Sequence, residues 1–180
     1  MTSTLMDDRG VVQAQIGRPP RSDVDVTARC HLGLPVVTTV PPLLDDDTPF
    51  PTLYWLTCPL ASKRIGRIEA AGGVRRAEMM VAEDPVLADR HVAAAERYRS
   101  TRDAMIPPGY SGHQPTGGVG GTGPGVKCLH AHYADAAAGN DNPVGEWTAA
   151  QIEPLDCEVG CVVAADDGTI IKNPGWIEPR

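Results

Sequence analysis

The sequence predicts an α+β fold, in which a small antiparallel sheet or a single hairpin packs with three to five helices in one domain. Three observations predict it. The chain has 180 residues, the size of one ordinary domain. Two β-branched, proline-flanked runs stand early in the chain, and segments with helical periodicity follow them. The 17 prolines and 19 glycines indicate long loops and few helices.

The two predicted strands are GLPVVTTVPPLL, residues 33–44, and PTLYWLTC, residues 51–58. Both are rich in β-branched or aromatic residues, which suit a pleated and half-buried surface. The turn-forming sequence DDDTP lies between them, so we expect the two strands to pair as a hairpin. Before them, residues 1–28 form a polar segment, read either as a loose tail or as a first short helix.

The predicted helices follow the second strand. The first covers residues 59–73, because Pro59 suits the first turn of a helix and two glycines stand at its end. Residues 74–83 continue as a short helix, and Asp84 is expected to cap a third one of about five turns. Residues 106–125 form an extended loop, and helices are expected over 126–139 and within 142–152. The core domain thus covers residues 29–150, and residues 151–180 are a C-terminal extension ending in a weak hairpin pattern.

The composition excludes several classes of function. The formal net charge is -7, which argues against non-specific nucleic-acid binding, because that needs clustered positive charge. The first ten residues lack the basic start and apolar stretch of a signal peptide, and no window approaches a membrane span. We therefore expect a cytoplasmic protein in which the five cysteines are reduced. Such cysteines are ligands, nucleophiles or buried apolar residues.

The segment VKCLHAHY, residues 126–133, carries the most chemistry. Cys128, His130 and His132 alternate along it and are all potential metal ligands. On a helix, Cys128 and His132 share a face because they are four residues apart, whereas His130 points away. His130 joins them if the helix starts one or two residues later. Asp135 is placed to orient the ring of His132.

A structural zinc usually needs four ligands, so this motif requires another. The best source is Cys58, which ends the second predicted strand. Cys58, Cys128 and His132, with His130 or a water as the fourth ligand, make a zinc set of either structural or hydrolytic type. The C-x3-C pair in the C-terminal extension is a further source of ligands. The alternative is that the cysteines are buried core residues.

Cys58 also supports a thiol-dependent enzyme acting on a phosphorylated or acyl substrate. At the start of a helix, the helix dipole lowers the pKa of a thiol, and three nearby cations, Lys63, Arg64 and Arg67, strengthen that effect. His130 or His132 would serve as the base for such a nucleophile. The competing interpretation places Cys58 in the core.

The glycine-rich loop before the motif suggests an anion site. Its match to G-x-G-x-x-G is weak because no strand precedes it, and Val126 breaks the Walker pattern. Backbone N–H groups that lead into a helix still attract phosphate. The candidate anion ligands are Gly120, Gly121, Gly123, Gly125 and Lys127, assisted by the basic run over residues 63–76. The alternatives are a flexible hinge and a solvent-exposed helix face.

Five blocks resemble an uncharacterised bacterial family, domain of unknown function 501. They are RCHLGLP (29–35), FPTLYWLTCP (50–59), GVGG (118–121), GVKCLHAHYA (125–134) and DNPVG (141–145). The resemblance implies that Cys30, Cys58, Cys128, His130 and His132 belong to the family pattern. It also implies a gene neighbourhood with a septum-formation initiator and an exopolyphosphatase. A non-enzymatic partner in cell division or polyphosphate metabolism is therefore a third hypothesis, with a phosphorylated small molecule or polyphosphate as ligand.

Overall fold

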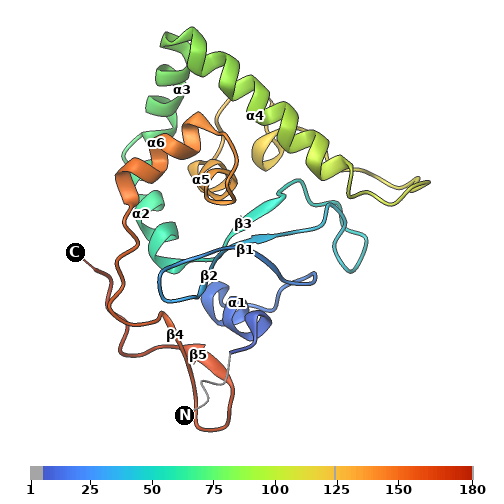
Figure 1. The fold of residues 1–180 in the computed structure, drawn as a ribbon. Helices are drawn as coiled ribbons and strands as arrows, with labels where there is room; N and C mark the ends of the chain where they lie inside the picture. Colours follow the sequence, from blue (N-terminus) through green and yellow to red (C-terminus); the bar gives the residue numbers. More distant parts are fainter. Residues whose placement is uncertain (1–5, 124, 180) are drawn as a thin grey trace.

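A three-stranded antiparallel sheet lies at the centre of the computed structural model, which describes residues 6–123 and 125–179 (Figure 1). The strands, in their order across the sheet, are β1 (Asp25–Arg29), β2 (Pro35–Thr39) and β3 (Tyr54–Leu56). A separate C-terminal hairpin pairs β4 (Val162–Ala164) with β5 (Ile170–Lys172). β2 is the most buried strand of the central sheet because it has a neighbour on each side.

The described residues form six α-helices and one short 3-10 helix. They are α1 (Asp8–Ile16), α2 (Pro59–Ala70), α3 (Gly73–Glu83), α4 (Pro85–Asp103), η1 (Val119–Gly121), α5 (Leu129–Ala137) and α6 (Pro143–Ile152). Prolines occupy the first positions of α2, α4 and α6, where the missing N–H costs nothing. The side chain of Asp84 caps α4 and that of Asn142 caps α6, as side-chain oxygens at helix starts commonly do.

The helices lie on both sides of the sheet (Figure 1). Helices α2 to α6 gather on one side, and α1 lies on the other side beside the C-terminal hairpin. Helix α5 is central, since it contacts β3, α2 and α6. Its Leu129 is fully buried with Val37 of β2, Leu60 of α2 and Val144 of α6. The core is thus built mainly from aliphatic side chains around α5.

The predicted fold class is confirmed, and the details differ in three places. β2 and β3 pair as the expected antiparallel neighbours, but the loop between them is longer, because β2 already ends at Thr39 and the prolines that follow have no N–H to donate to a ladder. α1 is the first short helix that the sequence left open for residues 1–28, whereas β1, at the end of that segment, was not expected; with α1 the described residues hold one α-helix more than the upper expectation. Helix α5 begins at Leu129 rather than at Val126, and this late start shapes the site described below.

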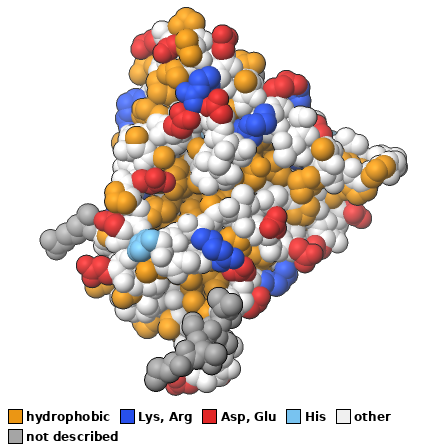
Figure 2. Space-filling model, in the orientation of Figure 1, with side chains coloured by type: hydrophobic (Ala, Val, Ile, Leu, Met, Phe, Trp, Pro, Cys, Tyr) orange, Lys and Arg blue, Asp and Glu red, His pale blue; other side chains and the backbone are white. Residues whose placement is uncertain are grey.

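The surface carries charges of both signs. On the face seen in Figure 2, Lys and Arg side chains lie beside Asp and Glu side chains, so no broad basic surface faces the viewer. In the part of the chain that the structure describes, no helix is both long enough and apolar enough to cross a bilayer.

Candidate functional site

The start of α5 brings Cys128 and His130 together. Cys128 is the residue before the helix and has an extended backbone, with φ -151° and ψ 118°. Its sulfur lies 3.7 Å from Nδ1 of His130, which stands in the first helical turn. The preferred pairing of Cys128 with His132 assumed that both lie on the helix, and this assumption is wrong because the helix starts one residue after Cys128. The late start brings in His130, the alternative that the sequence left open.

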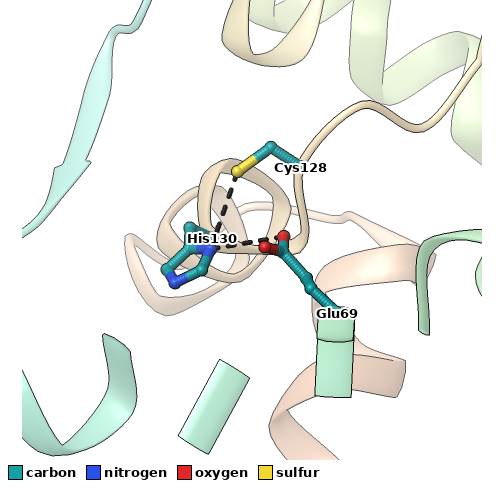
Figure 3. A group of neighbouring side chains, drawn as sticks. All are labelled: Glu69, Cys128 and His130. Carbon is teal, nitrogen blue, oxygen red and sulfur yellow. Dashed lines mark hydrogen bonds and ion pairs between the residues drawn. The ribbon is translucent and has the colours of Figure 1, made fainter. Parts of the chain in front are cut away.

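Glu69, in the last turn of α2, completes a three-residue cluster (Figure 3). Its Oε1 lies 3.2 Å from Nδ1 of His130 and accepts a hydrogen bond of 2.6 Å from the N–H of Leu129. The ligand atoms of Glu69, Cys128 and His130 all lie within 4.8 Å of one another. Sequence reasoning missed Glu69. Its only signal was that it is the single acid within a basic run.

The ring of His130 is held with Nδ1 facing the cluster. Its other nitrogen, Nε2, lies 3.1 Å from the carbonyl oxygen of Ser62, which can only accept, so Nε2 carries a proton. Burial alone would lower the pKa of His130, but the hydrogen bond with Cys128 and the charge of Glu69 outweigh it and raise that pKa to about 9. The space between sulfur, nitrogen and carboxylate therefore favours a positive charge.

The cluster has the chemistry and spacing of a metal site. Cys sulfur, His nitrogen and Glu oxygen are all zinc ligands, and tetrahedral zinc holds sulfur and nitrogen about 3.6 Å apart and nitrogen and oxygen about 3.3 Å apart. The corresponding distances here are 3.7 and 3.2 Å. A ligating histidine typically donates its other N–H to a carbonyl, as His130 does to Ser62. The side chains of His130 and Glu69 are 28% and 26% exposed, so solutes can reach them.

His132 lies apart from this cluster, in a buried network. Its Nδ1 donates to Oδ1 of Asn142 at 3.1 Å, and its ring stacks on that of His91 at 5.4 Å between centroids. Asp135 orients His132 through Asn142, whose amide donates to the carboxylate at 2.8 Å. Arg97 also donates to Asp135 through both guanidinium ends, at 3.1 and 2.6 Å. Burial lowers the pKa of His132 to about 4, so the ring is neutral.

Cys58 immediately precedes α2, as expected, but its environment opposes ionisation. The side chain is 7% exposed, and burial raises the pKa of the thiol to about 11, despite hydrogen bonds from the backbone N–H groups of Ala61 and Leu60. The expected depression of this pKa is therefore wrong, because desolvation outweighs the start of the helix. Cys58 does not belong to the cluster of Glu69, Cys128 and His130; its thiol neighbours are Cys161 and Cys30.

The glycine loop uses its conformational freedom for packing. Gly120 and Gly121 have φ of 65° and 78°, and a Cβ on Gly121 would lie 2.8 Å from Pro51. The residues expected to bind an anion are Gly120, Gly121, Gly123, Gly125 and Lys127; all are described, whereas Pro124 lies outside the described residues. Two N–H groups at this end of α5 already have acidic partners, since Val126 donates to Glu78 at 3.2 Å and Leu129 donates to Glu69. Lys127 is exposed.

The basic run of α2 contacts the C-terminal segment rather than this loop. Arg64 donates to the carbonyls of Ile152 and Pro154 and to Asp156, and Arg67 pairs with Glu178. These two cations are therefore paired within the protein, and the candidate site lies where the last turn of α2 meets the start of α5.

The comparisons with known proteins give one result. Residues 26–150, more than half of the chain, match the model of a family described as protein of unknown function (DUF501). No curated protein and no solved structure matches the chain.

Proposed function

Because the chain belongs to the DUF501 family, whose function is unknown, we propose a function from the site alone: the protein binds a zinc-class divalent ion through Glu69, Cys128 and His130. One observation carries the proposal. Three different zinc-ligand types, contributed by α2 and by the start of α5, point at one place with ligand-like spacing.

The partners of the ligands support this proposal. The carbonyl of Ser62 leaves the lone pair of Nδ1 of His130 free for an ion when the ring is neutral. The N–H of Leu129 orients the carboxylate of Glu69. Zinc sites with three protein ligands keep a fourth position for water or substrate, and the bound ion lowers the pKa of such a water. Partial exposure of His130 and Glu69 fits a site of this open kind.

Metal content and cobalt substitution test the proposal. Untagged protein should contain zinc or take up one equivalent of added Zn²⁺ or Co²⁺ at this site, and His130→Ala and Glu69→Gln should each weaken uptake by about tenfold or more. His113→Ala is the matched control, because His113 is an exposed histidine in the loop after α4. Uptake that is equal in the wild type, His130→Ala and Glu69→Gln would reject the site.

A thiol function is the second candidate, and the 3.7 Å contact between Cys128 and His130 favours it. In the metal-free protein, the thiol can pass its proton to the ring, which gives a thiolate and an imidazolium beside Glu69. This assigns the nucleophile to Cys128, whereas the sequence favoured Cys58. Rapid alkylation of Cys128 at neutral pH in metal-free protein, slowed by His130→Ala and blocked by Zn²⁺, would support both roles for one site. Slow alkylation in both states would exclude the nucleophile.

A further inference from the structure

Four of the five cysteines meet at a second place, away from the start of α5. Cys30 follows β1, Cys58 precedes α2, and Cys157 and Cys161 stand between α6 and β4. All four line one small cavity of about 10 Å³, enough for a single water-sized sphere. All five cysteines lie in the described part of the chain, and none forms a disulfide.

Two cations of α2 hold the C-terminal segment, which carries Cys157 and Cys161, against that helix. Arg64 holds the start of the segment, with hydrogen bonds of 2.6 Å to the carbonyl of Ile152, 2.7 Å to that of Pro154 and 2.9 Å to Asp156. The ammonium of Lys63 lies 4.8 Å from the ring centroid of Trp176. The basic run therefore fastens a segment that lies outside residues 26–150 onto a helix that lies inside them.

The sulfurs of this group accept hydrogen bonds from N–H donors. The indole N–H of Trp176 donates to Cys157 at 3.4 Å. The amide of Gln15, only 7% exposed, donates to Cys161 at 3.6 Å and to the carbonyl of Pro35 at 2.9 Å. Cys58 accepts from backbone N–H groups of the first turn of α2. N–H donors of this kind also support the thiolates of metal-bound cysteines.

We propose that Cys30, Cys58, Cys157 and Cys161 form a second metal site, in which four thiolates bind one zinc-class ion. Four cysteines are the commonest ligand set of a structural zinc. No three of these sulfurs lie mutually within 4.8 Å among the described residues, whereas tetrahedral zinc holds sulfurs about 3.8 Å apart, so binding draws the side chains inward. Four thiols bind Zn²⁺ with the release of up to four protons, which leaves a complex of charge about −2.

An open groove gives the ion a way in. A surface groove of about 640 Å³ is lined by Cys30 and Cys157, and these two residues also line the small cavity. The ion would join β1 and α2 to the C-terminal segment. The site is thus structural: it closes the C-terminal extension onto the family domain, and it is independent of the proposed site at Glu69, Cys128 and His130.

Cobalt binding to the full chain tests this proposal. A tetrathiolate Co²⁺ site has strong sulfur-to-metal charge-transfer absorption, which a site with a single thiolate does not reach. We expect this absorption in the wild type, its retention in Cys128→Ser and its loss in Cys161→Ser and Cys30→Ser. Zinc content should fall by one equivalent in the latter two variants. If the charge-transfer absorption changed equally in Cys128→Ser and in Cys161→Ser, the four-cysteine site would be overturned. The proposed site at Glu69, Cys128 and His130 would not be affected by that result.

A measurement on the wild type guards against variants that fail to fold. Peptide mapping after alkylation should show all four cysteines protected in the zinc-loaded protein, and chelation should speed their modification by about tenfold or more. Equal modification with and without chelator would overturn the proposal. So would a disulfide within the group in protein that takes up no metal there.

Discussion

The buried ring of His132 makes the stability of this protein depend on pH between about 6.5 and 4. The ring is neutral in the folded protein, where burial lowers its pKa from 6.5 to about 4. In the unfolded chain the ring takes up a proton below about pH 6.5. Folding stability from this group is therefore complete above pH 6.5 and is lost as the pH falls towards 4, because the unfolded state binds more protons.

The size of the effect follows from the two pKa values. Each unit between them is worth about 1.4 kcal/mol, so the full loss is about 3 kcal/mol, of which about 1.4 is reached at pH 5.5 and about 2.5 at pH 4.5. Solvent does not screen this contribution to stability, because His132 is only 1% exposed. His130 does not interfere in this window: its raised folded pKa contributes stability that is complete below pH 6.5 and is lost as the pH rises through about 9.

Urea unfolding of the metal-free protein at pH 7.0, 5.5 and 4.5 measures this dependence. Other groups also titrate in this range. The free energy of unfolding is therefore plotted against pH, and the slope for the wild type is compared with the slope for His132→Gln. We expect the variant to lose most of the acid dependence, and His113→Gln, at an exposed position, to keep it. A wild type that loses less than about 1 kcal/mol by pH 4.5, or a variant with an unchanged slope, would refute the assignment of His132 as a neutral core residue.

Three further predictions concern the surroundings of the two sites. Arg97→Ala should lower the free energy of unfolding by about 2 to 4 kcal/mol, because it leaves the fully buried carboxylate of Asp135 without its main cation; a double-mutant cycle with Asp135→Asn should return a coupling of about 2 kcal/mol. Gly145→Ala should cost more than about 2 kcal/mol in urea unfolding, since its Cβ would lie 2.2 Å from a backbone oxygen of α5, whereas Gly66→Ala, with open space around it, should stabilise α2 by up to about 1 kcal/mol. If the glycine loop binds anions, Lys127→Ala should weaken saturable phosphate or polyphosphate binding measured by calorimetry, and unchanged binding would count against it.

The fold class was predictable because its signals are local. The proline-bounded β-branched runs, the capping residues Asp84 and Asn142 and the glycines that follow helices act within a few residues of where they stand. β1 escaped notice because it is a short edge strand with an alternating, largely exposed pattern, in which β propensity carries little information. Its partner β2 decides that it is a strand.

The candidate site was half predictable. Cys128 and His130 are neighbours in the chain, so their approach depended only on where one helix begins. Glu69 lies 60 residues from Leu129, whose N–H it accepts, and no local pattern announces a contact of that kind. The environment of His132 was not predictable for the same reason. Its side chain faces His91 and Asn142, which come from other parts of the chain, and it belongs to a buried hydrogen-bonded network that includes Asn142.

The sequence by itself determined the fold class, most of the helices, the ligand-rich segment at the start of α5 and the family to which residues 26–150 belong. Only the tertiary structure decided which side chains share a site. It separated Cys58 from Cys128 and placed it with Cys30, Cys157 and Cys161, and it turned the basic run of α2 towards the C-terminal segment. The physical reason is that ligation and ionisation depend on distances of a few ångströms and on burial, which arise when helices from distant parts of the chain pack together.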